Sequence, residues 1–360
     1  MGKKKVVVGM SGGVDSSVAA WLLLEAGYDV IGVTMQIWQA EEDDVVSENG
    51  GCCGLSAVED AARVAQQLGI PHYVMNFRKE FEDSVIRYFM REYLEGRTPN
   101  PCIACNRYVK WESLLKRSME IGADYIATGH YARIEQLPGG RYAIRRSVTA
   151  AKDQTYALYS LTQEQLAHTL MPVGAYEKSR IRQFAQELGL KVAQKPDSME
   201  ICFVPDQDYA RFIEEHSGRT IPEGNFVTSD GTAIGRHRGI THYTVGQRKG
   251  LGLSMGRPVF VTEIRPQTNE VVVGEYDDVF TDRLICGDLQ FMSVADIPDE
   301  LAVVAKIRYN HQGAKAVVHR LDQNRAEVIF REPVRAVTPG QAVVFYDGEY
   351  VAGGGTILSG

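Results

Sequence analysis

The feature that most constrains this chain is a glycine-rich turn near its start. The run Val6-Val7-Val8 is uninterrupted and apolar, which is typical of a buried strand in a parallel sheet. Residues 17–26 then have helical spacing without a breaker, and Gly27 follows as a stop signal. A strand, a glycine turn and a helix start therefore follow one another. This geometry gathers backbone N–H groups and the positive end of a helix dipole, which favours an anion.

The residues of the turn exclude two common classes of anion-binding loop. The turn reads Gly9-Met10-Ser11-Gly12-Gly13-Val14-Asp15-Ser16. It contains no lysine, so it is not a P-loop, and it lacks the Gly-x-Gly-x-x-Gly pattern of dinucleotide-binding folds. The plain structural alternative is an ordinary strand-to-helix turn in which Asp15 and Ser16 only cap the helix.

Length and charge set the broad class. A chain of 360 residues is long enough for two or three domains with cores of their own. No apolar stretch approaches the length of a membrane span, and the basic start at 2–5 runs directly into the first strand, so we expect a cytoplasmic protein with no membrane partner. Its six cysteines are then mostly reduced and favour catalysis or metal binding over structural disulfides. The formal net charge of −7 leaves nucleic-acid binding to local basic patches.

The first half of the chain alternates predicted strands with predicted helices. Strands are expected at 31–35, 72–77 and 124–128, and helices at 58–68, 81–94 and 109–120. This alternation predicts an α/β fold with a doubly wound parallel sheet, whose ligands lie at the carboxyl ends of the strands.

A second informative stretch is the Cys-x-x-Cys formed by Cys102 and Cys105. Pro99 and Pro101 precede it, and two prolines so close together favour an exposed, stiff loop rather than a helix or strand. No second Cys-x-x-Cys completes a zinc site, and Cys202 is the single downstream partner. Three cysteines on two loops suit sulfur chemistry or an iron–sulfur cluster with one open iron.

Seven motifs occur in a fixed order along nearly the whole chain. They are Ser11–Ser16, Thr98–Pro101 with Cys105-Asn106, Ala127–Ala132, Lys152–Tyr156, Asp197-Ser198 with Ile201–Phe203, His242–Gly252 and Thr338–Gln341. The first resembles the pyrophosphate loop of ATP pyrophosphatases, which cleave ATP between its α and β phosphates. Together they resemble the bacterial tRNA-specific 2-thiouridylase family, which converts the C2 oxygen of the wobble uridine (U34) to sulfur. The resemblance implies a sulfurtransferase enzyme that uses ATP and Mg²⁺, acts on tRNA and yields 2-thiouridine, AMP and pyrophosphate.

The resemblance also assigns residues to the nucleotide. The serine hydroxyls and the glycine amides of the turn are expected to hold the leaving pyrophosphate, and Asp15 to hold Mg²⁺ or orient the helix start. Met35 is expected to contact adenine through its backbone, and Gly129 to lie against the adenylate. The expected ATP-binding set is Gly9, Met10, Ser11, Gly12, Gly13, Val14, Asp15, Ser16, Met35 and Gly129.

Further residues are assigned to the tRNA. Asn100, Pro101 and Cys102 are expected to lie at the target base, which must leave its stack before C2 can react. The remaining expected tRNA contacts are His130, Lys152, Asp153, Gln154, Arg308, Tyr309 and Gln341. For His130 a buried, satisfied histidine is the alternative.

Two sulfur mechanisms remain open. In the family's persulfide form, Cys202 carries a sulfur from a donor protein, a cysteine desulfurase or a relay, and Cys105 is the catalytic thiol; the two end as a disulfide. Many members have Asp where this chain has Cys102, so the carboxylate that assists there is missing. The rival form has Cys102, Cys105 and Cys202 ligating a [4Fe-4S] cluster whose open iron binds inorganic sulfide.

The second half of the chain changes character. A helix is expected at 206–216, followed by short strands at 259–264, 270–273, 285–291, 303–309, 316–321, 326–330 and 342–346, which suggest a small β-barrel. We therefore expect three domains: a catalytic domain at 1–206, a small central tRNA-contacting α+β or β domain at 207–278, and a tRNA-binding barrel at 279–360.

Two other classes of protein fit part of the sequence. An ATP pyrophosphatase acting on a small molecule explains the turn but gives the cysteines and the barrel no role. A non-catalytic RNA-binding protein explains the barrel but leaves the turn without one.

Overall fold

The computed structural model describes residues 2–38, 55–196 and 201–360. The chain divides into two compact units, which are described separately. The first comprises Met1–Val85, Cys102–Pro205 and Glu349–Val351, and the second comprises Ile86–Pro101, Asp206–Gly348 and Ala352–Gly360. The segment 86–101 thus belongs to the second unit although it lies inside the predicted first domain; the division into three domains stays a prediction.

The first unit is built on a parallel sheet, which confirms the predicted fold class. Its five strands lie in the order β3-β2-β1-β4-β7, and every pairing is parallel. Their bounds are β1 Lys5–Gly9, β2 Asp29–Gln36, β3 His72–Asn76, β4 Tyr125–Ala127 and β7 Thr169–Leu170. The strand order reverses at β1, between β2 and β4, and in such sheets ligands bind at this switch point.

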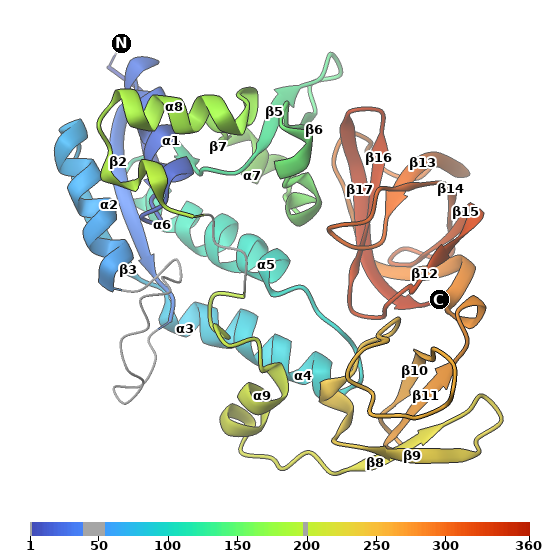
Figure 1. Cartoon of the computed structure of the whole chain (residues 1–360). Coiled ribbons are helices and arrows are strands. Elements are labelled where there is room, and N and C mark those ends of the chain that lie inside the picture. Colours follow the sequence, from blue (N-terminus) through green and yellow to red (C-terminus); the bar gives the residue numbers. More distant parts are fainter. Residues whose placement is uncertain (1, 39–54, 197–200) are drawn as a thin grey trace. The chain divides into compact units, whose positions relative to one another are not determined.

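The apolar run of β1 explains why it is central. Val6, Val7 and Val8 are all fully buried, as expected for a strand covered on both faces. Val6 and Val8 share one core with helices α1 (Val14–Glu25), α2 (Leu55–Leu68) and α8 (Lys178–Glu187), and α1 and α8 lie side by side in Figure 1.

Shorter elements complete the first unit. A hairpin of β5 (Ala132–Gln136) and β6 (Tyr142–Arg146) was not predicted, although Pro138-Gly139-Gly140 marks its turn. The other helical elements are α3 Arg78–Phe81, η1 Glu82–Ile86, α5 Pro101–Ala104, η2 Cys105–Leu114, α6 Leu115–Glu120, η3 Ala150–Lys152, η4 Thr155–Leu158, α7 Gln163–Ala167, η5 Pro172–Ala175 and η6 Lys191–Gln194.

The second unit contains a small four-stranded sheet and two helices. The sheet order is β10-β11-β8-β9. The bounds are α4 Arg87–Leu94, α9 Tyr209–Ser217, β8 Gly224–Val227, β9 Ala233–His237, η7 Ile240–His242, β10 Phe260–Arg265, β11 Glu270–Gly274 and η8 Asp277–Val279. Phe89 of α4 meets Tyr209 and Phe212 of α9 edge to face, at ring distances of 5.9 and 6.4 Å. Of the predicted strands, 259–264 and 270–273 belong here and not to the barrel.

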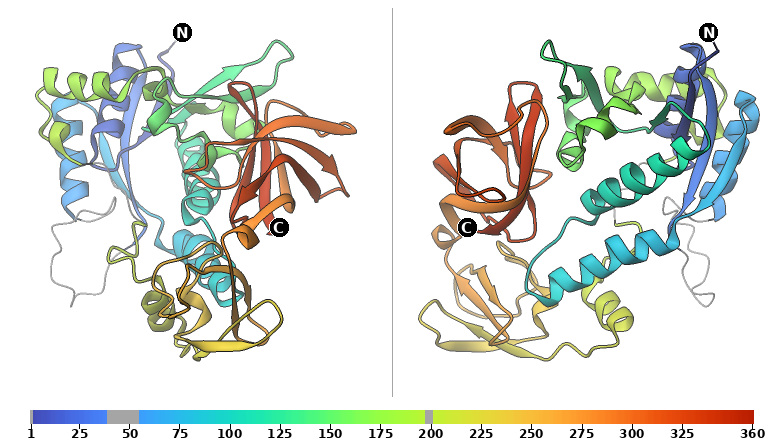
Figure 2. Two further views of the ribbon diagram at one scale, coloured as in Figure 1. Left: turned by 45° about the vertical axis from the view of Figure 1, so that its right-hand side comes forward. Right: turned by 180° about the vertical axis from the view of Figure 1, so that it is seen from behind.

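The predicted barrel is confirmed. Six strands follow one another as β12-β15-β14-β13-β16-β17, and β12 also pairs with β17, which closes the ring (Figure 2). Their bounds are β12 Phe280–Phe291, β13 Glu300–Lys306, β14 Ala314–Arg320, β15 Ala326–Arg335, β16 Ala342–Asp347 and β17 Tyr350–Ser359.

Strand β17 was missed because its glycines hide the strand pattern. A Cβ on Gly353 would lie 2.3 Å from the carbonyl oxygen of Gln290, and one on Gly355 would lie 2.7 Å from that of Gly287. The seam between β17 and β12 therefore requires glycine, since the two backbones approach too closely for any side chain.

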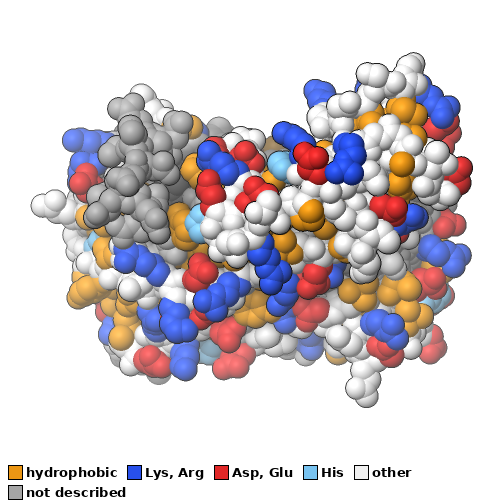
Figure 3. All heavy atoms as spheres, turned by 90° about the horizontal axis from the view of Figure 1, so that it is seen from below, with side chains coloured by type: hydrophobic (Ala, Val, Ile, Leu, Met, Phe, Trp, Pro, Cys, Tyr) orange, Lys and Arg blue, Asp and Glu red, His pale blue; other side chains and the backbone are white. Residues whose placement is uncertain are grey.

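Among the residues that the structure describes, no helix is both long enough and apolar enough to cross a membrane. On the face drawn in Figure 3, acidic and basic side chains are interspersed, so charges of one sign do not dominate it.

Candidate active site

The turn between β1 and α1 is held in shape by its own serines. The amide of Ser11 donates to Ser16 Oγ (3.2 Å), and the Ser16 hydroxyl donates to the carbonyl of Gly13 (3.3 Å). The Ser17 hydroxyl donates to the same carbonyl at 2.8 Å. Gly13, the residue before α1, has no side chain that could cap the first helical N–H groups. The turn is therefore preformed by its own hydrogen bonds at the start of a helix, a position that favours an anion.

Two glycines close the turn against its neighbours. Gly12 has φ +67°, and a Cβ there would lie 2.4 Å from the carbonyl oxygen of Ala57. Gly129 follows β4, and a Cβ there would lie 2.6 Å from the amide nitrogen of Ser16. The structure thus brings Gly129 to the predicted turn across the switch point of the sheet.

Other residues of the predicted set contribute backbone rather than side chain. Met10 and Val14 are almost fully buried in the core behind the turn. The amide of Met10 donates to Val33 (2.8 Å), and the Thr34 hydroxyl donates to the carbonyl of Met10 (2.9 Å). Met35 is the next residue on β2, so its backbone lies just past the turn, in register with Met75 of β3.

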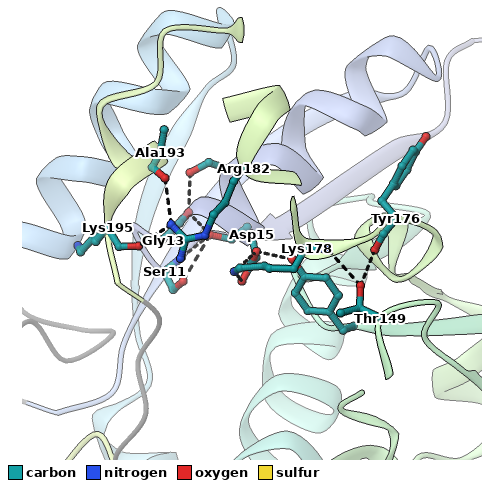
Figure 4. Close-up of polar contacts among 12 residues, drawn as sticks. Ser11, Gly13, Asp15, Thr149, Tyr176, Lys178, Arg182, Ala193 and Lys195 are labelled. Carbon is teal, nitrogen blue, oxygen red and sulfur yellow. Dashed lines mark hydrogen bonds and ion pairs between the residues drawn. The ribbon is translucent and has the colours of Figure 1, made fainter. Parts of the chain in front are cut away.

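Asp15 is the charged centre of the turn. The Tyr131 hydroxyl donates to its carboxylate at 2.7 Å, and Lys178 Nζ contacts both carboxylate oxygens at 2.8 Å. Figure 4 shows Asp15 and Lys178 directed toward one another beside Ser11 and Gly13. Its carboxylate is thus engaged within the protein rather than by the helix start.

Three basic residues beside the turn escaped the sequence analysis. They are Lys178 and Arg182 of α8, and Lys195 just after η6. Lys195 Nζ donates to the carbonyl of Gly12 at 3.2 Å and pairs with Asp60 at 2.9 Å. Burial raises the pKa of Asp60, but hydrogen bonds from Lys195 and Arg63 outweigh it, and the net pKa is lowered. The sequence signal for these three cations is indirect: the turn itself contains no lysine, so any positive side chains beside a bound anion must come from other parts of the chain.

The prediction that the Cys-x-x-Cys lies in a loop is wrong. Pro101 begins a helix, because proline fits the first helical position, where its missing N–H is not needed. The helix runs through α5, η2 and α6 to Glu120, with η2 wound as a π-helix. Cys102 is exposed and Cys105 half-buried on its first turns, and Cys202 is also half-buried.

The fit of an iron–sulfur cluster can be tested on these thiols. Among residues 2–38, 55–196 and 201–360, no group of three or more His, Cys, Asp or Glu side chains is arranged to hold a metal ion. Cys102, Cys105 and Cys202 all lie within those ranges and do not form such a group. The residues described do not fit a cluster. Cys52, Cys53, Asp197 and Ser198 lie outside the described residues.

We call the helix at 101–120, which carries Cys102 and Cys105, the thiol helix; the segment before it is anchored within the second unit. Arg97 makes a two-pronged ion pair with the buried Glu92 (2.6 and 2.8 Å), and this hydrogen bonding raises the pKa of Arg97. The amide of Thr98 donates to the carbonyl of Pro339 (2.9 Å), and Gln341 Nε2 donates to the carbonyls of Thr98 (2.8 Å) and Pro99 (3.3 Å). We call residues 96–100 the anchored loop and Thr338–Gln341 the barrel turn.

The predicted tRNA residues of the first unit are engaged internally. Asp153 accepts hydrogen bonds from the amide of Ser147 and the hydroxyl of Thr155, and Gln154 accepts from the amide of Tyr131. His130 contacts the hydroxyl of Thr128 at 2.7 Å and packs on Trp111; burial, and then the charge of Lys110, lowers its pKa well below the usual range. Lys152 lies in η3 of the same region.

The predicted tRNA residues of the second unit differ in exposure. Arg308 donates to the carbonyl of Arg335 (2.6 Å), whereas Tyr309 exposes 40% of its surface. Gln341 lies in the barrel turn, directed at the anchored loop.

Fold and site together define a nucleotide-binding α/β protein whose anion turn is built from glycines and serines. In agreement, residues 4–206 match the family described as the tRNA methyl transferase HUP domain. Residues 210–275 match its PRC-barrel domain, and residues 281–357 match the aminomethyltransferase beta-barrel domain.

The chain belongs to the family of tRNA-specific 2-thiouridylases. A protein of that name from Lachnoclostridium phytofermentans is 66% identical over 99% of both chains. Those of Acetivibrio thermocellus (57%, over 99% of this chain and 100% of that one) and Clostridioides difficile (56%, over 98% of both) follow. A solved 4-thiouridine synthetase in an RNA complex with bound ATP has a TM-score of only 0.33 at 20% identity, over 59% of this chain and 50% of that one, a likeness too low to bear on the fold.

Proposed function

We propose that this protein is a tRNA-uridine 2-sulfurtransferase that converts U34 of tRNA to 2-thiouridine with consumption of ATP. The observation that carries the proposal is the 66% identity, over 99% of the chain, to a tRNA-specific 2-thiouridylase. The preformed glycine–serine turn at the switch point of the sheet supports it, since the turn suits the pyrophosphate of ATP. With tRNA and ATP as substrates, we also propose a cytoplasmic location.

The nucleotide is proposed to lie over the turn. The hydroxyls of Ser11 and Ser16 and the amides of Gly12 and Gly13 would bind the pyrophosphate, and Gly129 would lie against the AMP part. The full proposed set is Gly9, Met10, Ser11, Gly12, Gly13, Val14, Asp15, Ser16, Met35 and Gly129. Asp15 fits a role toward Mg²⁺, because Mg²⁺ in nucleotide sites takes one or two carboxylates together with the substrate phosphates. When bound, Mg²⁺ would neutralise phosphate charge.

The uridine is proposed to meet the start of the thiol helix, at Asn100, Pro101 and Cys102. Lys152, Arg308 and Tyr309 are proposed as tRNA contacts, with the exposed Tyr309 ring able to stack on a base. His130, Asp153, Gln154 and Gln341 are proposed to act on tRNA chiefly by holding these segments in place, since their side chains make the internal hydrogen bonds described above.

The reaction is proposed to proceed in two stages. The O2 atom of uridine attacks the α-phosphate of ATP, and pyrophosphate leaves with the electron pair of the broken P–O bond. A persulfide on Cys202, delivered by a sulfur-donor protein, then attacks C2 through its terminal sulfur, and AMP leaves with the former O2. The Cys105 thiolate attacks Sγ of Cys202, which releases 2-thiouridine and forms a Cys105–Cys202 disulfide. A dithiol reductant restores the two thiols.

A test compares tRNA nucleosides by mass spectrometry after incubation with ATP, Mg²⁺ and a persulfide donor. The wild type and Cys102→Ser are expected to form 2-thiouridine, whereas Cys105→Ser and Cys202→Ser form none. Loss of product with Cys102→Ser as well would contradict the persulfide route and favour a site that needs all three thiols. No 2-thiouridine from the wild type, with the donor shown to be active, would overturn the proposed function.

A further inference from the structure

The anion turn has positive groups around it that its own sequence does not contain. No lysine or arginine occurs among residues 9–16. Figure 4 shows Lys178, Arg182 and Lys195 placed around Ser11, Gly13 and Asp15. All belong to the stretch from α8 to just beyond η6, far along the chain from the turn.

Lys178 is better enclosed than Lys195, whose side chain is 28% exposed. The Lys178 side chain is 13% exposed, and its Nζ lies 2.8 Å from each oxygen of Asp15 and 5.5 Å from the centre of the Tyr131 ring. The Thr149 hydroxyl fixes the start of α8, because it accepts from the amide of Lys178 (3.1 Å) and donates to the carbonyl of Tyr176 (3.0 Å). The base of the side chain is therefore fixed, while its four-carbon stem can redirect the ammonium group.

Arg182 lies four residues after Lys178 on α8, which places both on one face of the helix. Its guanidinium donates to the carbonyls of Ala193 (3.1 Å) and Lys195 (3.4 Å), and so ties α8 to the segment that carries Lys195. The three cations are thus fixed relative to the turn by one connected set of contacts.

The negative charge of a bound triphosphate requires a cation such as Lys178. A triphosphate brings several negative charges, whereas a helix N-terminus offers only about half a positive charge. P-loop proteins meet this need with a lysine inside the loop. Here the Lys178 ammonium lies at the turn, paired with the one carboxylate that Mg²⁺ would use.

We propose that Lys178, supported by Arg182, is the phosphate-binding lysine of this site. Lys178 pairs with Asp15 in the structure and moves to the β- and γ-phosphates when ATP binds, which leaves the Asp15 carboxylate to Mg²⁺. This inference rests on the proposed function. As the bond from the α-phosphorus to the bridging oxygen breaks, its electron pair goes to pyrophosphate, and the ammonium neutralises that charge.

Ligand fragments test this assignment directly. Inorganic pyrophosphate and AMP are titrated separately into the full-length protein in the presence of Mg²⁺, by calorimetry. Lys178→Met is expected to weaken pyrophosphate binding by about 10–100-fold, the range of one lost charge-assisted hydrogen bond, and to leave AMP binding unchanged. Lys178→Arg is expected to restore most of the pyrophosphate affinity, since it keeps the charge.

Lys191→Met is the matched control, because Lys191 is an exposed lysine of η6. Arg182→Met is the second variant, useful if Lys178→Met fails to fold; it is expected to weaken pyrophosphate binding about 3–10-fold with AMP binding intact.

Three results would overturn the inference. Pyrophosphate affinity of Lys178→Met and Arg182→Met equal to that of the control removes both residues from the phosphate site. An equal loss of AMP and pyrophosphate binding shows a collapsed site rather than a lost phosphate contact. A wild type that binds neither ligand nor ATP overturns the proposed function, and this inference with it.

Discussion

The turn after β1 and the anchored loop before α5 are held in place by different kinds of contact. Gly12 and Gly129 close the turn by backbone approach, at distances where any side chain would collide. The anchored loop is held by hydrogen bonds, with the carbonyls of Thr98 and Pro99 accepting from the side-chain Nε2 of Gln341. Steric closure has no substitute, whereas a hydrogen bond can be exchanged for another of similar strength. The first arrangement suits a ligand that always binds in one way, and the second suits a segment that must yield to a large partner such as RNA.

The largest effect is expected from breaking the steric closure with Gly129→Ala. The new methyl would lie 2.6 Å from the amide nitrogen of Ser16 and 2.7 Å from the carbonyl carbon of Asp15, so the turn must shift. We expect the rate of adenylation to fall at least about 100-fold, because a displacement of about 1 Å at a reacting centre lowers a rate by about that factor. ATP–pyrophosphate exchange with tRNA present measures it. Gly139→Ala, which has nothing within 4 Å of its new methyl, is the control. Full exchange by Gly129→Ala would show that the turn is adaptable after all.

A smaller effect is expected from Gly340→Ala, which pushes the barrel turn off the anchored loop. Gly340 has φ +89°, and a Cβ there would lie 3.0 Å from Arg97 Cβ and from the amide nitrogen of Thr98. The close contact with Arg97 and Thr98, added to a positive-φ strain of about 1–2 kcal/mol that the control shares, should lower tRNA thiolation roughly tenfold and leave ATP binding unchanged. Gly348→Ala, with φ +55° but open space, matches the strain without the contact. Equal loss in both variants would assign the effect to backbone strain alone.

Gln341→Ala is expected to cost less, because it removes two hydrogen bonds and displaces nothing. At about 1 kcal/mol per hydrogen bond, amide hydrogen exchange at Thr98 should quicken by roughly fivefold or more. Gln323→Ala, at an exposed glutamine in another turn of the barrel, is the control. Unchanged exchange at Thr98, combined with weaker tRNA binding, would make Gln341 a tRNA contact only.

The smallest effect is expected from a change of pH, which should lower the stability of the first unit and leave amide exchange in the anchored loop unchanged. Burial lowers the pKa of His130 and of His72, so the unfolded chain binds protons near pH 6.5 that the folded chain does not. Their contribution to stability is complete above that pH and is lost as the pH falls through it. Urea unfolding between pH 7.5 and 5.5 should show a falling midpoint, with a shallower fall in His130→Gln. Exchange at Thr98 by local opening should not change beyond its intrinsic pH dependence, since the anchored loop has no histidine; a change there would point to His237, His242 or His311 of the second unit, whose pKa values burial also lowers.

The sequence predicted those parts of the molecule whose signals are local. The strand, the glycine turn and the helix start are adjacent in the chain, so the residues of this stretch alone predict the turn. Regularly spaced strands predicted the barrel. Strand β17 was missed, because its glycines are required by the close approach of the β12 backbone, which the sequence does not show. Pro101 was misread because proline breaks a helix in its interior, whereas at the first helical position it is favoured. Lys178 and Arg182 could not be predicted, since nothing near them in the sequence refers to a turn more than a hundred residues earlier.

The barrel turn has a consequence for how the protein is made. The hydrogen-bond partner of Thr98 is Gln341, which follows 243 residues later in the chain. The carbonyl of Gln341 in turn accepts a hydrogen bond from the amide of Ile357 at 2.8 Å. At about 5–20 residues per second, the ribosome needs on the order of 10–50 s to supply that partner. The nucleotide turn can therefore be complete on a nascent chain while the anchored loop still lacks its hydrogen bonds to the barrel turn. We expect ribosome-bound or truncated chains that lack residue 357 to bind ATP but not to thiolate tRNA, because the barrel cannot then close through the pairing of β12 with β17.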